Sequence, residues 1–326
     1  MTVLCRVLKV TRAAFYKWLG RKPSPTETRQ KQIVTEIRQI HALPRHQDYG
    51  SPRIHQKLLS QGTRVSRNTV AKMMNQHNIH ARNKKKFRVR TTDSRHSLPI
   101  APNRLQQRFS AESPDQIWLT DFTFIPVAGK FSYLCTVQDL CSRKIIGWAA
   151  SQNIDTRLAL AALDQAIAFR RPQNGLIVHS DRGSQYASEA FRKRLADHGF
   201  LQSMSRKGNC YDNAPMESFF KSFKVEEVDH AVYESHEQAV RAAADYIERF
   251  YNAIRLHSAL GYVSPNQFEQ TRMFVNKRRP EICLRRSHSS VARQKLATDN
   301  GDREADFDTA FVGDFRGSEP SSLPIP

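Results

Sequence analysis

Three carboxylates lie within or directly beside segments of largely apolar residues, where an acidic side chain is unusual. Asp121 interrupts the apolar and β-branched run WLTDFTF, and Asp181 directly follows the apolar run GLIVHS. Glu217 lies near the start of APMESFFKSF, a segment with helical spacing of apolar residues. Each acid has an ordinary explanation by itself: an anomaly at a strand edge, a turn residue, or a favourable charge at a helix N-terminus. Their chemistry depends on whether the fold brings them together.

Carboxylates that converge repel one another unless a hard cation neutralises them. A set of oxygen ligands suits Mg²⁺ or Mn²⁺. Two such ions, about 3.5–4 Å apart, activate an attacking oxygen and stabilise a leaving oxygen when a phosphodiester is displaced in line. Asp121, Asp181 and Glu217 are therefore the candidate catalytic residues and metal ligands, with two ions in the active site.

The segment that carries these acids has the pattern of a sheet with helices. Three β-rich runs, QIWLTDFTFIPVA, KFSYLCTVQDL and RKIIGWAAS, precede a helix expected over 155–171. GLIVHS and FLQSMS add two strands, with helices over 188–198 and 215–228, and a further helix is expected over about 236–251. In the order β-β-β-α-β-α-β-α, the first and fourth strands are neighbours and the last helix can pack beside them. The acids would then meet at one edge.

Cations surround these acids along the chain. Lys221 and Lys224 follow Glu217 by four and seven residues on the same helix face, where they could hold phosphates. An ion pair between Glu217 and Lys221 is the alternative. Arg182, next to Gly183, is expected to approach DNA.

Several polar residues nearby have two interpretations. Asp212 or Asn213 is expected to cap the helix of Glu217, and the cationic loop SRKGNCYDN is expected to form a flexible lid over substrate. Asp139 ends the second strand and is expected to be a turn residue rather than a partner of the catalytic acids. His257 could contact DNA or make a structural hydrogen bond.

A helical region precedes the sheet. Its apolar residues have helical spacing, and Ser66 is the expected cap of a helix whose buried stripe contains Val70 and Met73. Arg67 and Lys72 lie on the opposite face of that helix, as expected for a helix that reads a DNA groove. The basic run ARNKKKFRVR follows, and there we expect phosphate contacts rather than a merely solvated segment. The residues concerned are Lys84, Lys85 and Lys86.

The composition favours a nucleic acid partner. The 326 residues include 51 Lys and Arg against 31 Asp and Glu, a formal charge of +20. No apolar run approaches the roughly 20 residues of a membrane span, and basic residues interrupt the N-terminus where a signal peptide would be apolar. Five cysteines without a C-x-x-C motif argue against a disulfide framework and a zinc finger. We expect a cytoplasmic protein without a membrane partner.

Five parts are expected along the chain. They are a helix–turn–helix segment (1–22), a helical DNA-binding domain with a basic end (28–90), a linker (91–110), a catalytic core (111–274) and a charged, disordered tail (275–326). For the first part, a plain packing unit of two helices fits almost as well.

Four motifs in order resemble a known family. WLTDFTFIP, HSDRGSQY, SRKGNCYDNAPMESFFKSFKVE and YNAIRLHSALGYVSPNQFE, with 35 residues between Asp181 and Glu217, resemble bacterial insertion-sequence transposases of the two-frame (OrfB) type. These belong to the DDE superfamily, which includes retroviral integrases. The resemblance covers about residues 1–270. It implies an α/β fold: a ribonuclease-H-like mixed sheet preceded by an all-α helix–turn–helix region, with Asp121, Asp181 and Glu217 in the triad positions and two divalent ions bound.

The implied function is that of a DNA transposase. It would bind the element's terminal repeats and catalyse metal-dependent strand cleavage and strand transfer into target DNA. It would act as a homo-oligomer on DNA, together with or fused to the upstream-frame product, in the bacterial cytoplasm and on the nucleoid when DNA-bound. The alternatives are a metal-dependent nuclease without joining activity and a non-catalytic DNA-binding regulator of transposition. A nuclease would not require the helical DNA-binding units, and the intact triad argues against a regulator.

Overall fold

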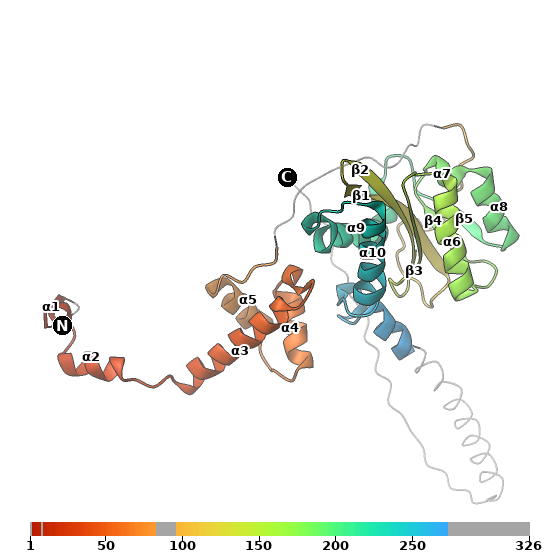
Figure 1. Cartoon of the computed structure of the whole chain (residues 1–326). Coiled ribbons are helices and arrows are strands. Elements are labelled where there is room, and N and C mark those ends of the chain that lie inside the picture. The colour runs from red at the N-terminus through yellow and green to blue at the C-terminus, as the bar shows by residue number, and fades with distance from the viewer. Residues whose placement is uncertain (1, 8, 83–95, 273–326) are drawn as a thin grey trace, which may run out of the picture. The chain divides into compact units, whose positions relative to one another are not determined.

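The computed structural model describes residues 2–7, 9–82 and 96–272 (Figure 1). The expectations for Lys84, Lys85 and Lys86 and for the tail from residue 275 lie outside these ranges. Within them, the structure contains one mixed sheet and a separate set of N-terminal helices.

The five-stranded sheet has the order β3-β2-β1-β4-β5. The pairs β1–β2 and β2–β3 are antiparallel, whereas β1–β4 and β4–β5 are parallel. The expected neighbourhood of the first and fourth strands is therefore confirmed. The strands are β1 (Ile117–Val127), β2 (Lys130–Asp139), β3 (Ile145–Ser151), β4 (Ile177–Ser180) and β5 (Leu201–Met204).

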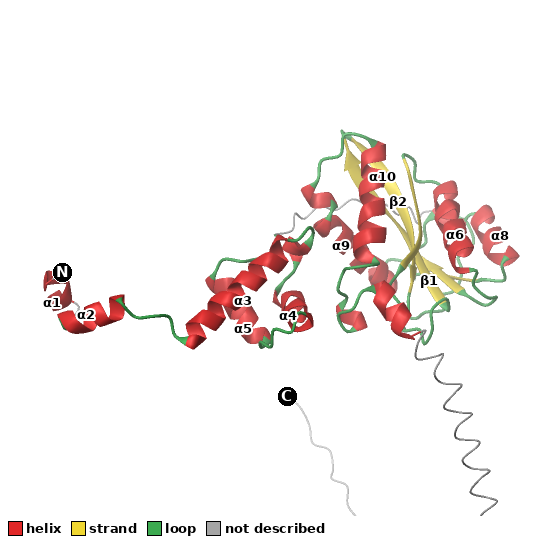
Figure 2. Cartoon of the chain, turned by 60° about the horizontal axis from the view of Figure 1, so that its bottom comes forward, coloured by secondary structure: helices red, strands yellow, loops and turns green. Residues whose placement is uncertain are grey.

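Helices cover both faces of the sheet, with α6 and α8 on one side and α9 and α10 on the other (Figure 2). Asp155 and Ser188 accept capping hydrogen bonds at the starts of α6 and α8. Gly147 on β3 lets α6 pack closely, because a Cβ there would collide with the α6 backbone at Ala162. The helices are α6 (Thr156–Arg170), α7 (Ser184–Ala187), α8 (Glu189–Asp197), α9 (Ala214–Glu226) and α10 (His236–Ala244).

Strand β1 divides its side chains between two cores. Trp118 and Phe122 pack with α6, α7 and α8, whereas Leu119 and Ile125 pack with α9 and α10. Side chains alternate along a strand, so Asp121, two residues after Leu119, faces the side of α9. The sheet therefore directs this acid toward the helix that carries Glu217.

The helix expected over 236–251 changes type partway. After α10 the chain forms a π-helix, Asp245–Tyr251. The backbone N–H of Asn252 donates to the carbonyl of Ile247, five residues earlier, at 3.0 Å. This wider winding buries both Tyr246 and Tyr251, also five residues apart, in the core beneath α9.

The N-terminal helices follow the expected pattern. Ser66 accepts a hydrogen bond from the N–H of Thr69, which confirms the cap of α5, and a capping box at Ser24 begins α3. The stripe expected on α5 is buried, and so is an apolar stripe on α3; the residues are Val70, Met73 and Met74 on α5 and Ile33, Ile37 and Ile40 on α3. The helices are α1 (Thr2–Val7), α2 (Arg12–Leu19), α3 (Pro25–Ala42), α4 (Ser51–Ser60) and α5 (Arg67–Gln76). None of the described helices has both the length and the apolar character needed to cross a membrane.

Candidate active site

The strand register aligns two of the three acids. In the parallel pair, Leu119 of β1 lies opposite His179 of β4. Two residues further along each chain stand Asp121 and Asp181, and with the two-residue side-chain period they share one face of the sheet. Asp121 lies within β1, and Asp181 comes directly after the end of β4.

Backbone and amide groups hold both carboxylates in place. Asp121 Oδ1 accepts from the N–H of Phe122 at 2.8 Å, and its Oδ2 accepts from Asn213 Nδ2 at 3.1 Å. Asp181 Oδ1 accepts from the N–H of Gly183 at 2.9 Å. A Cβ on Gly183 would lie only 3.1 Å from that oxygen, so a glycine suits the close approach.

The electrostatics of the pair favour a bound cation. Burial raises the pKa of Asp121 well above its ordinary value, and the charges of Asp181 and then Glu217 raise it further. Asp121 makes no ion pair with any described residue. Next to it, the buried Oδ1 of Asn213 has no hydrogen-bond partner in the described part of the chain. These oxygens have the chemistry that Mg²⁺ or Mn²⁺ prefers.

Glu217 lies in the first turn of α9 with its side chain exposed, and its partial burial raises its pKa. It is close enough to affect the pKa of Asp121. However, in the ranges that the structure describes, no three His, Cys, Asp or Glu side chains are gathered closely enough to hold a metal ion. The structure brings Asp121 and Asp181 together and places Glu217 nearby, short of a complete ligand set.

Asn213 has a different role from the expected one. It stands at the N-cap position of α9, yet its side chain makes no capping hydrogen bond there. The side chain donates to Asp121 instead, which ties the start of α9 to β1. A sequence offers no signal for this contact beyond an amide just before the helix of Glu217.

The loop that was expected to be a flexible cationic lid is fastened. Asp212 is fully buried and accepts three hydrogen bonds from Arg206, at 2.8, 3.0 and 2.8 Å. Asn103 and Gln107 also donate to it, at 2.9 and 3.0 Å. The Arg206 guanidinium holds the pKa of Asp212 well below its usual range. One of the loop's cations is therefore neutralised, and the loop is tied to residues 103–107.

The cations expected to contact DNA differ in availability. Arg67, Lys72 and Lys221 are exposed, and Lys221 forms no ion pair with Glu217. The Lys224 ammonium lies 3.5 Å from the centroid of the Phe124 ring, and burial lowers its pKa to about 8. Arg182 Nε donates to the carbonyl of Ser205 at 2.6 Å, so part of its guanidinium serves the loop structure.

Two further expectations have clear outcomes. Asp139 is buried and accepts from the N–H groups of Asp115 and Ser142, at 2.7 and 2.8 Å, which confirms a turn residue. His257 is buried beside Arg255 and stacks edge-on to Tyr251, and burial and neighbouring arginines lower its pKa to about 2. It is therefore a neutral histidine inside the protein.

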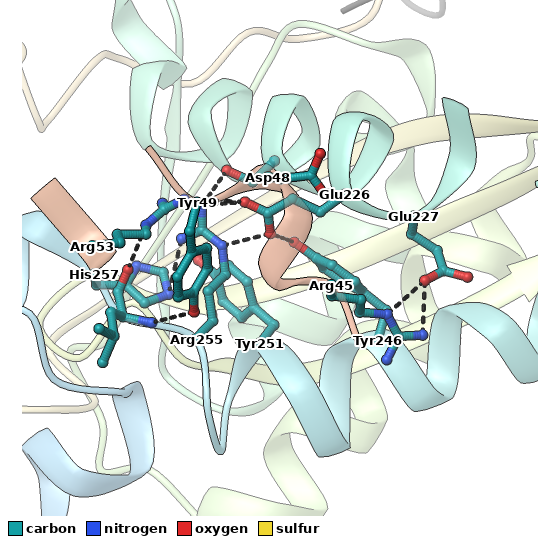
Figure 3. Close-up of polar contacts among 12 residues, drawn as sticks. Arg45, Asp48, Tyr49, Arg53, Glu226, Glu227, Tyr246, Tyr251, Arg255 and His257 are labelled. Atoms are coloured by element: carbon teal, nitrogen blue, oxygen red, sulfur yellow. Dashed lines mark hydrogen bonds and ion pairs between the residues drawn. The ribbon is translucent and has the colours of Figure 1, made fainter. Parts of the chain in front are cut away.

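A buried ion-pair cluster lies at the far end of α9 (Figure 3). Glu226 is 5% exposed and accepts from Arg255 Nε and Nη2 at 2.7 and 2.9 Å and from the Tyr246 hydroxyl at 2.8 Å. Arg53 of α4 reaches the same carboxylate at 3.4 Å. Glu226 was not among the predicted site residues. It continues the buried stripe Met216–Phe219–Phe223 at helical spacing, and this spacing is the sequence signal for its burial.

A second contact joins the helical region to the core. Arg45, just after α3, pairs with Glu227 and with Asp245, both at 2.7 Å. The Tyr49 hydroxyl accepts from the N–H of Leu256 at 3.4 Å. Through Arg45, which follows α3, and Arg53 of α4, the helical region is attached to the C-terminal end of α9 and to the π-helix.

The chain is similar to integrase core domains, to an HTH-like domain and to transposases. The chain matches the family described as "Integrase core domain" over residues 111–210, a second family of that description over 217–273, and "HTH-like domain" over 28–87. It is 38% identical over 267 residues to "Transposase InsF for insertion sequence IS3A" of Escherichia coli (strain K12), covering 82% of this chain and 92% of that protein.

Two other proteins are similar. "Insertion element IS600 uncharacterized 31 kDa protein" of Shigella sonnei is also 38% identical over 267 residues, which are 82% of this chain and 97% of that protein. Among solved structures, a simian T-cell lymphotropic virus intasome complex aligns with a TM-score of 0.40 and 16% identity, over 66% of this chain and 70% of the other.

Proposed function

The chain belongs to the family of insertion-sequence transposases that includes InsF of IS3, and from this premise we propose that Asp121, Asp181 and Glu217 form its catalytic site. The protein is a DNA transposase, a polynucleotidyl transferase with an integrase core and a helix–turn–helix-like region. The observation that supports this site most is the β1–β4 register, which sets Asp121 and Asp181 on one face beside α9.

The three carboxylates would hold two divalent ions, Mg²⁺ or Mn²⁺. When bound, these ions supply Lewis-acid polarisation of the phosphodiester and neutralise its developing charge. The protein's part is to hold the ligands: the N–H groups of Phe122 and Gly183 fix one oxygen each of Asp121 and Asp181. Asn213 ties the first turn of α9, and with it Glu217, to Asp121.

The proposed reaction has two displacements at phosphorus. In the first, water forms a P–O bond and a bridging P–O bond breaks, which releases a 3′-hydroxyl at the element's end. In the second, that 3′-hydroxyl forms a P–O bond to a phosphodiester of target DNA and gives up its proton, while the bond from phosphorus to the target strand's own 3′-oxygen breaks and that oxygen leaves as a hydroxyl. No side chain forms a covalent intermediate.

Different cationic residues would contact different parts of the DNA. Arg67 and Lys72 on α5 are exposed and suited to the terminal repeats, and Lys221 is suited to phosphates near the acids. The basic run with Lys84, Lys85 and Lys86 would add phosphate contacts. The active species would be a homo-oligomer on DNA, with or fused to an upstream-frame product, acting in the bacterial cytoplasm and on the nucleoid.

The decisive experiment incubates the purified protein with labelled duplexes that carry candidate element ends, in Mg²⁺ or Mn²⁺. We expect nicked ends and joined products. Asp181→Asn and Glu217→Gln should each reduce the rates of nicking and joining by about 10³-fold or more while DNA binding persists. Glu189→Gln, an exposed first-turn glutamate on α8, is the matched control and should remain active.

Three outcomes would contradict the proposal. Cleavage without any joined product would indicate a nuclease, and binding without cleavage in either metal would indicate a regulator. Appreciable activity of Glu217→Gln would remove this residue from the proposed triad.

A further inference from the structure

A cavity of about 370 Å³ lies beside α9, lined by three arginines from different parts of the chain. Arg53 comes from α4 of the helical region, Arg143 from the turn between β2 and β3, and Arg255 from the segment after the π-helix. We call it the arginine pocket. Among the described residues that line it there is no aspartate or glutamate, and three are serines with hydroxyl groups: Ser218, Ser222 and Ser258.

The arginine pocket has more positive charge than its surroundings neutralise. Arg255 and Arg53 share the single carboxylate of Glu226. Arg143 donates to the carbonyl of Phe109 at 3.1 Å, and no carboxylate in the described ranges lies within 4 Å of it. Burial lowers the pKa of Arg143, and the charge of Asp139, which lies beyond ion-pair distance, does not offset this.

His257 reports the same excess charge. It lines the pocket, and its pKa is lowered to about 2 by burial and then by the charges of Arg255, Arg53 and Arg143. A site whose described lining combines one buried and two half-buried arginines with hydroxyl donors and no acid is suited to an oxyanion. Guanidinium forks match the oxygens of a phosphate in charge and geometry.

The position of the pocket indicates which oxyanion. Its α9 wall runs from Ala214 through Ser218 to Ser222, and Ser218 comes one residue after Glu217. The wall is therefore about 100° around the helix from the face of Glu217. Asn213, which donates to Asp121, directly precedes the wall.

We propose that the arginine pocket binds a phosphate group of the DNA backbone next to the catalytic site. This inference builds on the proposed function. Since Arg53 belongs to the helical region and Arg143 to the core, one phosphate would contact both regions at once. Engaged DNA would then stabilise the attachment of the DNA-binding helices to α9.

The test uses the full chain and two pocket variants. Arg143→Gln removes the guanidinium that lacks a carboxylate partner. Ser258→Asp adds a carboxylate at an exposed position on the rim, and Ser258→Ala is its neutral control. Lys193→Ala, an exposed lysine on α8, controls for the loss of one positive charge elsewhere.

We expect both pocket variants to bind a duplex element end roughly tenfold more weakly, the effect of one charged hydrogen-bonded contact. Ser258→Ala and Lys193→Ala should remain within about twofold of the unaltered protein, since neither changes the pocket's charge. The slope of log affinity against log salt should fall by about 0.9 in Arg143→Gln, because one phosphate contact is lost. Melting temperatures of the Ser258 pair establish that the aspartate variant is folded.

Inorganic phosphate separates the two sources of the anion. At constant ionic strength, phosphate should raise the melting temperature of the unaltered protein and compete with DNA, and both effects should weaken in Arg143→Gln. Protection by phosphate with unchanged DNA affinity in both variants would overturn the DNA assignment in favour of a free-anion site. An equal loss of DNA affinity in Lys193→Ala would overturn it in favour of general charge.

This result is independent of catalysis. If the protein cleaves and joins DNA while the pocket variants bind ends normally, the pocket proposal fails and the proposed function stands. If the pocket variants lose end binding but the unaltered protein neither cleaves nor joins, the proposed function fails instead.

Discussion

The two ends of α9 carry glutamates in opposite situations. Glu217, in the first turn, is exposed and makes no ion pair with the described residues. Glu226, nine residues later, is buried with Arg255, Arg53 and Tyr246 around it. A structural carboxylate has its cations within the protein, whereas a carboxylate meant for a ligand leaves its charge available.

The pKa shifts show the same contrast. At the first end, burial and the charge of Asp181 raise the pKa of Asp121, so negative charge is in excess. At the other end, burial opposes the charged form of Arg255, but Glu226 overcomes this and raises the pKa of Arg255 above its ordinary value. The first end therefore has an excess of negative charge, whereas the Glu226 carboxylate at the second end already has its cations within the protein.

The largest effect on stability is expected at the C-terminal end of α9, where Glu226 is paired with arginines. Glu226→Ala should lower the free energy of unfolding by about 3–5 kcal/mol, because it leaves the Arg255 guanidinium buried without its partner. Urea unfolding measures this. Arg157→Ala, which removes the exposed partner of Asp155, is the control and should change stability by under about 1 kcal/mol. A loss of similar size in both variants would end the distinction between structural and exposed pairs.

A smaller effect on stability is expected at the N-terminal end of α9, near Glu217 and Asp121. Mg²⁺ at ten times its dissociation constant should stabilise the protein by about 1.4 kcal/mol, because it binds the folded state alone. Asp121→Asn should remove this response and, without metal at neutral pH, should itself raise the melting temperature by relieving repulsion. Calorimetry at several metal concentrations measures both.

The pH dependence of the Asp121→Asn gain has a definite sign. An acid whose pKa is raised in the folded state binds more protons there than in the unfolded chain, so its ionisation destabilises the fold as pH rises above the unfolded value near 3.8. The gain from Asp121→Asn should therefore be present at neutral pH and disappear as the pH falls toward about 4. A gain that grows in acid would refute the electrostatic account.

The smallest effect separates the two lysines on the face of Glu217. Lys221→Ala should weaken binding of element ends by roughly fivefold, equivalent to about 1 kcal/mol. Lys224→Ala should weaken it less, because its ammonium lies against the Phe124 ring. Fluorescence anisotropy with labelled ends compares the two. A larger binding defect for Lys224→Ala would show that this lysine turns from the ring to the DNA.

Patterns local in sequence were predictable. Alternation and helical spacing predicted the strands and helices, and their order placed β1 beside β4, so the proximity of Asp121 and Asp181 could be predicted. The caps of α5 and α6 follow from short-range hydrogen bonding by Ser66 and Asp155.

Contacts distant in sequence were not predictable. Arg53 and Glu226 are separated by 173 residues, and neither local sequence predicts that the two side chains are in contact. Asn213 and Asp121 are 92 residues apart, and a capping role satisfied the sequence pattern equally well. The polar partners of a buried group depend on tertiary packing, which periodicity does not encode.

The π-helix makes the length of its segment matter more than its composition. In an α-helix, residues five apart point about 140° away from each other. Here the wider winding lets Tyr246 donate to Glu226 while Tyr251 accepts from Gln138, both beneath α9. Deleting one residue between them would restore ordinary winding and rotate everything that follows, Arg255 included. A point substitution in this turn changes the contacts of one side chain. A single-codon deletion would move Arg255 away from both Glu226 and the arginine pocket, so the ion-pair cluster and the pocket would be lost together.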